Sequence, residues 1–123
     1  MSQVWRVLPS AYDSVGLVVT AMDAASRLID NGGVRLSRQL GGVPLSRYID
    51  CGSARAGSSI DNYDIVLNVR TQLRANDSVA TSVITEVQAM GRPAAFSQDY
   101  SRCSSTGKLE SHLADVIQAK LRP

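Results

Sequence analysis

The fold is decided by two stretches, YDIVLNVRTQL at residues 63–73 and VATSVITEVQA at residues 79–89. In both, apolar residues and threonines alternate with polar residues, and Val66 is an apolar residue on the polar side of the first stretch. A period of two is typical of a strand with one buried face. The short polar segment 74–77 between the stretches suits a turn. The sequence therefore predicts a long antiparallel hairpin with one buried face and one face in water.

The segments around this hairpin predict the rest of the domain. Helical spacing of apolar residues from Val4 to Val15 predicts a first helix, which is either bent at Pro9 or begins there. A last helix is predicted over residues 109–121. Residues 17–22, 27–30 and 34–40 favour strands, and the glycines after Asn31 favour a tight hairpin turn.

Together these elements predict one α+β domain over residues 1–123. We expect a four- to five-stranded antiparallel sheet with an N-terminal and a C-terminal helix packed on one face, in a helix-grip-like arrangement. The expected core comprises Ile65, Leu67, Val69, Val83, Val87, Leu113 and Ile117.

Composition excludes several function classes. The net charge is only +2, and the eleven arginines and two lysines are scattered, whereas a nucleic-acid-binding protein usually gathers its basic residues on one stripe. No stretch approaches the roughly 18 apolar residues that span a bilayer. The first residues lack the features of a signal peptide. We therefore expect either a cytoplasmic protein or a mature domain whose leader is absent from this chain.

The two cysteines, Cys51 and Cys103, each lie in a polar segment that contains glycine. We expect a disulfide between them, which would stabilise the fold by about 4 kcal/mol in the chain-entropy model and indicates an oxidising compartment. The alternative is two free thiols in a reducing cytosol. Two cysteines and one histidine fall short of a zinc site, so no metal or cofactor is expected.

The only histidine is His112, which flanks the apolar face of the last helix. A general base needs a nucleophile and an orienting carboxylate close in space. Cys103 and Ser105 are near in sequence, but a cysteine in a disulfide is no nucleophile. We interpret His112 as a satisfied surface histidine with no obvious catalytic partner, and we expect no catalytic residue in the chain.

Two regions are candidates for contact with a partner. On the polar side of the hairpin, Arg70 and Arg74 are expected to face water. The long segment 41–60 is rich in glycine, and Val43-Pro44-Leu45 within it offers an apolar anchor.

Two further segments carry a resemblance to known proteins. In the opening, a helix that bears an aromatic residue leads through a glycine into a strand and an acidic turn, over Val4-Trp5, Leu8, Tyr12, Val15-Gly16-Leu17-Val18-Val19 and Asp23. This opening resembles the start of the helix-grip domains in the outer-membrane-assembly lipoprotein C family. The segment Cys-Ser-Ser-Thr-Gly-Lys-Leu-Glu at residues 103–110 is similar to bacterial envelope proteins of unassigned function. The resemblance implies a non-catalytic periplasmic domain, with membrane association indirect or through a lipid-anchored N-terminal segment missing from this chain.

Three functions compete at this point. The first is a non-catalytic periplasmic accessory or scaffold domain that docks on protein subunits of a larger envelope or membrane complex, without nucleic acid. The second is a carrier of a small apolar ligand between the helices and the sheet. The third is a small hydrolase or transferase that uses residues 41–60. Fold class alone does not separate them.

Overall fold

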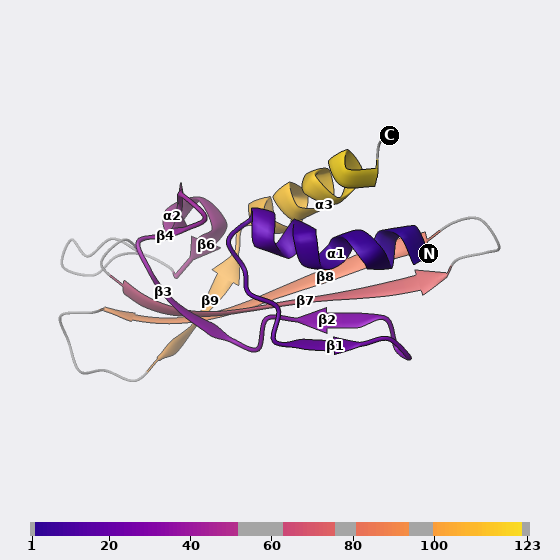
Figure 1. Cartoon of the computed structure of the whole chain (residues 1–123). Helices are drawn as coiled ribbons and strands as arrows, with labels where there is room; N and C mark the ends of the chain where they lie inside the picture. The colour runs from indigo at the N-terminus through magenta and orange to yellow at the C-terminus, as the bar shows by residue number, and fades with distance from the viewer. Residues whose placement is uncertain (1, 52–62, 76–80, 94–99, 122–123) are drawn as a thin grey trace.

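The computed structural model describes residues 2–51, 63–75, 81–93 and 100–121 (Figure 1). Within these ranges the chain begins and ends with a helix, as expected. The elements, in chain order, are α1 (Ser2–Ser14), β1 (Ala21–Asp23), β2 (Leu28–Asp30), β3 (Val34–Ser37), β4 (Gln39–Leu40), β5 (Val43–Pro44), α2 (Leu45–Tyr48), β6 (Ile49–Asp50), β7 (Tyr63–Ala75), β8 (Thr81–Pro93), β9 (Ser101–Ser105) and α3 (Lys108–Leu121).

The long hairpin is confirmed. β7 and β8 pair antiparallel along their whole length, from Tyr63 opposite Pro93 to Ala75 opposite Thr81. The described residues form a seven-stranded sheet in the order β1-β2-β7-β8-β9-β6, in which β3 also pairs with β7, and a separate two-stranded sheet of β4 and β5. The α+β class with an antiparallel sheet is therefore confirmed. The sheet has more strands than expected because short strands are added at both edges.

Both long helices lie on the same face of the sheet, where α1 and α3 also contact each other (Figure 1). Among the predicted core residues, burial is confirmed for Ile65, Leu67, Val69, Leu113 and Ile117. α1 contributes Leu8 and Tyr12, which are 0% exposed. The opposite face of the sheet, which we call the open face, carries none of the three described helices (Figure 1).

Two predicted core residues on β8 are not buried. Val83 is 38% exposed, and Val87 is only partly buried. Both lie on the same face as the buried residues of β7, because Val83 pairs with Leu73, which is 3% exposed. β9, however, pairs with β8 only from Ala89 to Gly91. Within the described residues β8 is thus an edge strand at Val83, and its side chain lacks a neighbour on one side.

The segment after β2 is not the hairpin turn that its glycines predict. β2 and β3 both pair antiparallel with β7, so they run in the same direction along it. Between β2 and β3, the buried Asn31 side chain forms the hydrogen bonds to β7 that a neighbouring strand would otherwise form. The Val69 N–H donates to Asn31 Oδ1 at 2.7 Å, and Asn31 Nδ2 donates to the Leu67 carbonyl at 3.1 Å. The positive φ angles of Gly32 and Gly33, 72° and 84°, permit a sideways step here and not a reversal.

The first helix is tied to the middle of β7 by one buried phenol. α1 begins at Ser2 and runs through Pro9, so the alternative of a start at Pro9 is wrong. The Tyr12 hydroxyl lies 2.7 Å from Thr71 Oγ1, which lies 3.1 Å from Thr85 Oγ1. Burial raises the pKa of Tyr12 to about 12, because the phenolate would be cut off from water. The phenol therefore stays neutral and bonded to β7.

A close approach of two glycines positions the segment that follows β3. Gly16, after α1, has φ 92°, and Gly41, in the turn between β4 and β5, has φ 57°. A Cβ on Gly41 would lie 2.6 Å from the Val15 carbonyl oxygen, and a Cβ on Gly16 would lie 2.7 Å from the Gly41 nitrogen. Only glycine permits this contact between two backbones. It holds the β4–β5 turn against the end of α1 and so fixes where α2 begins.

Candidate functional site

The predicted disulfide between Cys51 and Cys103 is confirmed. Asp50 of β6 lies opposite Ser104 of β9, so the next position in the same register places the two cysteines opposite each other, with their Cα atoms 4.2 Å apart. Gly91 of β8 leaves room for the bridge, because a Cβ there would lie 3.1 Å from each sulfur. The disulfide therefore fastens β6, at the edge of the sheet, and with it α2, to β9.

The polar residues of the segment 103–110 hold the start of α3. Ser105 Oγ donates to both carboxylate oxygens of Glu110, at 2.7 and 2.9 Å, and accepts from the Gly107 N–H. Thr106 Oγ1 donates to the Arg47 carbonyl at 2.7 Å, and its backbone N–H donates to the Tyr48 carbonyl. These bonds satisfy backbone groups at the end of α2 and at the beginning of α3. The hydroxyls of this motif thus have a structural explanation.

His112 is partly buried and has a hydrogen-bond partner, as expected of a satisfied histidine beside the apolar face of α3. Its Nδ1 lies 2.8 Å from the Tyr48 hydroxyl, and the two rings stack with centroids 6.3 Å apart. Tyr48 is 2% exposed, and burial raises its pKa, so the phenol is neutral at ordinary pH. The pair joins α2 to α3. It is a packed contact between two helices and leaves the ring nitrogen Nδ1 occupied.

The apolar anchor expected at Val43-Pro44-Leu45 is partly wrong. Leu45 is 0% exposed and belongs to the core, because it starts α2 with its side chain turned inward. Val43 is half-buried against the same core, and only Pro44 is exposed. Of this segment, Pro44 alone is a candidate contact. Residues 52–60 of the predicted loop lie outside the described residues.

The expectation for Arg70 and Arg74 agrees with the structure, which exposes both on the open face. Asp30, Arg70 and Glu86 form one row across β2, β7 and β8. Arg70 Nε lies 3.4 Å from Asp30 Oδ2, yet 53% of the Arg70 side chain remains exposed. An exposed ion pair of this kind contributes at most about 1 kcal/mol to the stability of the fold. Arg70 can therefore bind a partner's carboxylate at little cost.

A hollow of about 270 Å³ lies on the open face beside this row. Ile84 forms part of it and is 38% exposed. Its lining combines apolar, charged, amide and hydroxyl side chains: Ser26, Leu28, Arg70, Gln72, Ile84 and Glu86. A second hollow, of about 50 Å³, lies on the other side of Arg70 and Glu86 and is lined by Asn68 and Gln88 as well. Arg70 and Glu86 thus form a charged ridge between two depressions.

The sequence identified Arg70 as a candidate contact, but not the apolar residues Leu28 and Ile84 that line the hollow beside it. The available signal was Ile84, an apolar residue on the polar side of its strand, in the same way as Val66. Leu28 could not be placed beside Ile84 from the sequence. Their meeting depends on Gln72 of β7 pairing with Leu28 on one side and with Ile84 on the other.

No family model, curated protein or solved structure matches the chain. The resemblance to the lipoprotein C family thus stays a prediction. Within the described ranges, no helix is both long enough and apolar enough to cross a membrane. The same ranges contain no group of three or more His, Cys, Asp or Glu residues that could hold a metal ion.

Proposed function

We propose that the chain is a non-catalytic accessory domain that docks on a larger protein assembly through the open face of its sheet. The observation that carries the proposal is the hollow at Ile84, next to the Arg70–Glu86 ridge. Energetic anchors of protein interfaces are typically aromatic or arginine side chains that fill small desolvated pockets. A hollow of about 270 Å³ is just below the range of drug-sized ligand sites, and it suits one apolar side chain of a partner.

Packing between helices and sheet argues against a carrier of apolar ligands. A carrier needs an internal cavity next to the helices. Instead, the side chains that face each other across this layer have no accessible surface: Leu8, Tyr12, Ile65, Leu67, Leu109 and Leu113 are all 0% exposed. The described layer is filled by the protein's own side chains, as in an ordinary core.

Among the described residues, the serine and the histidine that lie close together in sequence at the start of α3 have other partners. Ser105 bonds to Glu110, and His112 bonds to Tyr48, so the hydroxyl and the imidazole are not directed at each other. Both pairs serve to join α2, β9 and α3. A docking function needs neither pair to react, which favours it over the hydrolase.

The disulfide supports a proposal for the compartment. Disulfides persist in oxidising compartments such as the bacterial periplasm and are rare in the cytosol. We therefore propose a periplasmic domain that acts in the cell envelope, with any membrane association made through its partner or through an anchoring segment.

Site-specific photocrosslinking tests this function. A photoreactive benzoylphenylalanine replaces Ile84 in cells of the organism of origin, and the matched control carries it at Ala114, an exposed position of α3 on the other side of the molecule. We expect a discrete protein adduct from position 84, absent from position 114, and weaker after Arg70→Glu. Equal adducts from both positions, or none from position 84, would contradict docking on the open face.

A further inference from the structure

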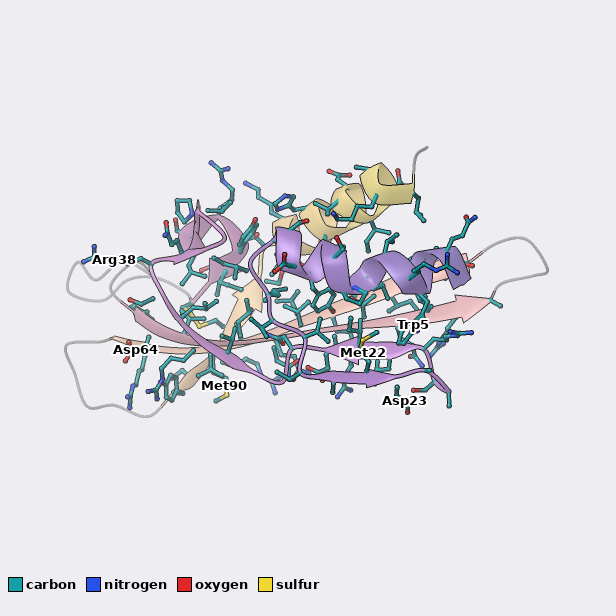
Figure 2. The ribbon with its side chains drawn as sticks, in the orientation of Figure 1. Trp5, Met22, Asp23, Arg38, Asp64 and Met90 are labelled. Carbon is teal, nitrogen blue, oxygen red and sulfur yellow. A yellow bond between two sulfur atoms is a disulfide. The ribbon has the colours of Figure 1, made fainter. Side chains whose placement is uncertain are left out.

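One end of the open face carries a cluster of arginines that the hollow at Ile84 does not include. Arg35 of β3 lies in one row with Val66, Met90 and Arg102 across the sheet. Arg92 of β8 lies in the next row, opposite Asp64. Figure 2 shows Met90 and Asp64 on the side of the sheet away from the helices. We call Arg35, Arg92 and Arg102 the arginine cluster.

An aromatic ring orients two of these guanidinium groups. The Arg92 guanidinium carbon lies 4.6 Å from the centroid of the Tyr100 ring, and Arg35 Nη2 donates to the Tyr100 hydroxyl at 3.3 Å. A cation over a ring face is held by the ring's quadrupole. Two arginines from strands far apart in the sequence are thereby brought together before any partner arrives.

The acidic side chains among the described residues of these rows neutralise the cluster only in part. Arg92 Nε lies 3.6 Å from Asp64 Oδ2, and both side chains are about one-third exposed, at 32% and 31%. Arg102 is exposed beside Met90, which is 46% exposed. Among the described residues of these two rows, three arginines face one aspartate, which leaves a net charge of +2. Between this cluster and Arg74 at the other end of β7, the row of Asp30, Arg70 and Glu86 has a net negative charge.

We propose that the arginine cluster binds an acidic, extended segment of the protein partner, with a carboxylate at the arginines and an apolar side chain on Met90. The proposal rests on the docking function and gives the chemistry of the partner. The fork of a guanidinium matches a carboxylate with two parallel hydrogen bonds. Met is flexible and polarisable, so it adapts to different apolar side chains. In an extended chain, residues two positions apart point the same way, so the expected pattern is acidic, any residue, apolar.

A protein segment fits better than an anionic membrane or a nucleic acid. A flat or long polyanion would cover more of the open face and would press its charges against Asp30 and Glu86. Like charges placed directly opposite each other are unfavourable. A short acidic segment can occupy the arginine end alone and leave the hollow at Ile84 to another part of the same partner.

Peptide titration of the purified, disulfide-bonded chain tests the proposal. The probe is a short acetylated peptide in which serine alternates with glutamate and leucine, and its control has glutamine in place of glutamate. Binding is followed by nuclear magnetic resonance at low salt. We expect the peptide to shift the resonances of Met90 and Arg102. Its affinity should fall at least about tenfold after Arg102→Glu, and should not change after Arg6→Glu, at an exposed position of α1. Thermal unfolding confirms that both variants fold.

Three results would overturn the proposal: equal binding of both peptides, equal loss in both arginine variants, or Arg102-dependent binding of phosphatidylglycerol vesicles without binding of the peptide. The proposed function is judged separately. If the crosslink from position 84 persists while the peptide fails to bind, docking stands and only the acidic chemistry is wrong. If the peptide binds but position 84 yields no adduct, the docking function on the hollow is wrong.

Discussion

Replacing Asn31 with alanine should destabilise the fold far more than the same replacement of an ordinary polar residue between two strands. The side chain is buried, 2% exposed, and it supplies one acceptor and one donor to β7. Its removal leaves the Val69 N–H and the Leu67 carbonyl without these partners. A buried polar group left without its hydrogen bond costs about 1–3 kcal/mol, so we expect a loss of roughly 2–4 kcal/mol, allowing for partial entry of water.

The control is Asn68→Ala. Asn68 lies next to these groups on β7, but it is on the open face beside the smaller hollow, and its loss should cost less than about 0.5 kcal/mol. Urea unfolding followed by circular dichroism, with the disulfide intact, measures both changes. Asn31→Asp adds a second test, because a carboxylate keeps an acceptor for Val69 but cannot donate to Leu67 unless it is protonated. If Asn31→Ala and Asn68→Ala lose equal stability, the bridging role of Asn31 is wrong.

Four further perturbations follow from the same contacts. The pKa of Tyr12 is raised from 10.0 to about 12 in the fold, so the phenol ionises in the unfolded chain first as the pH rises from 10 towards 12. Over that window the wild type should lose up to about 2–3 kcal/mol of stability relative to Tyr12→Phe in alkaline unfolding curves, and a constant difference would contradict a buried neutral phenol. Gly91→Ala places a Cβ 2.7 Å from Ile65 Cδ1 and should cost about 1–3 kcal/mol; wild-type stability would show that the disulfide and Ile65 move aside freely. Reducing the disulfide, whose cysteines are 52 residues apart, should cost about 4 kcal/mol, with an unchanged melting temperature in dithiothreitol as the contrary result. His112→Ala removes the partner of the Tyr48 hydroxyl and should cost about 1 kcal/mol while the crosslink from position 84 persists; loss of that crosslink in a folded variant would revive an active role for His112.

The hairpin could be predicted because its signal is local. Alternation over residues 63–73 needs no knowledge of other segments, and it placed Arg70 correctly on the water-exposed side. The same alternation could not decide how well each inward residue is covered. The alternation assigns Val83 to the correct face of the sheet, but its burial depends on whether β9 lies beside it, and β9 pairs with β8 no further than Ala89. The face of a residue is a property of its own strand, whereas its burial depends on the neighbouring strands.

The errors around the glycines have a different cause. A positive φ at Gly32 and Gly33 is compatible with a reversal of the chain and also with a sideways step between two strands of the same direction. What decides between them is a third strand, since both flanking strands pair with β7. Leu45 was misplaced for a related reason. Its neighbours are loop-forming residues, but the contact between Gly16 and Gly41 carries the segment back over the core.

The candidate site was only half visible in the sequence, because it is made by register. Ile84 and Leu28 meet through Gln72, and Arg35 and Arg92 meet through Tyr100. Each residue alone is an ordinary surface side chain. The segment 103–110, which begins at the disulfide, is the opposite case. Its residues form a conspicuous motif in the sequence, but their hydrogen bonds join α2, β9 and α3 and leave the motif with a structural role. The cysteine and hydroxyl residues that stand out in the sequence therefore hold the fold, whereas most of the surface proposed to bind, Arg70 excepted, is assembled from residues that do not stand out.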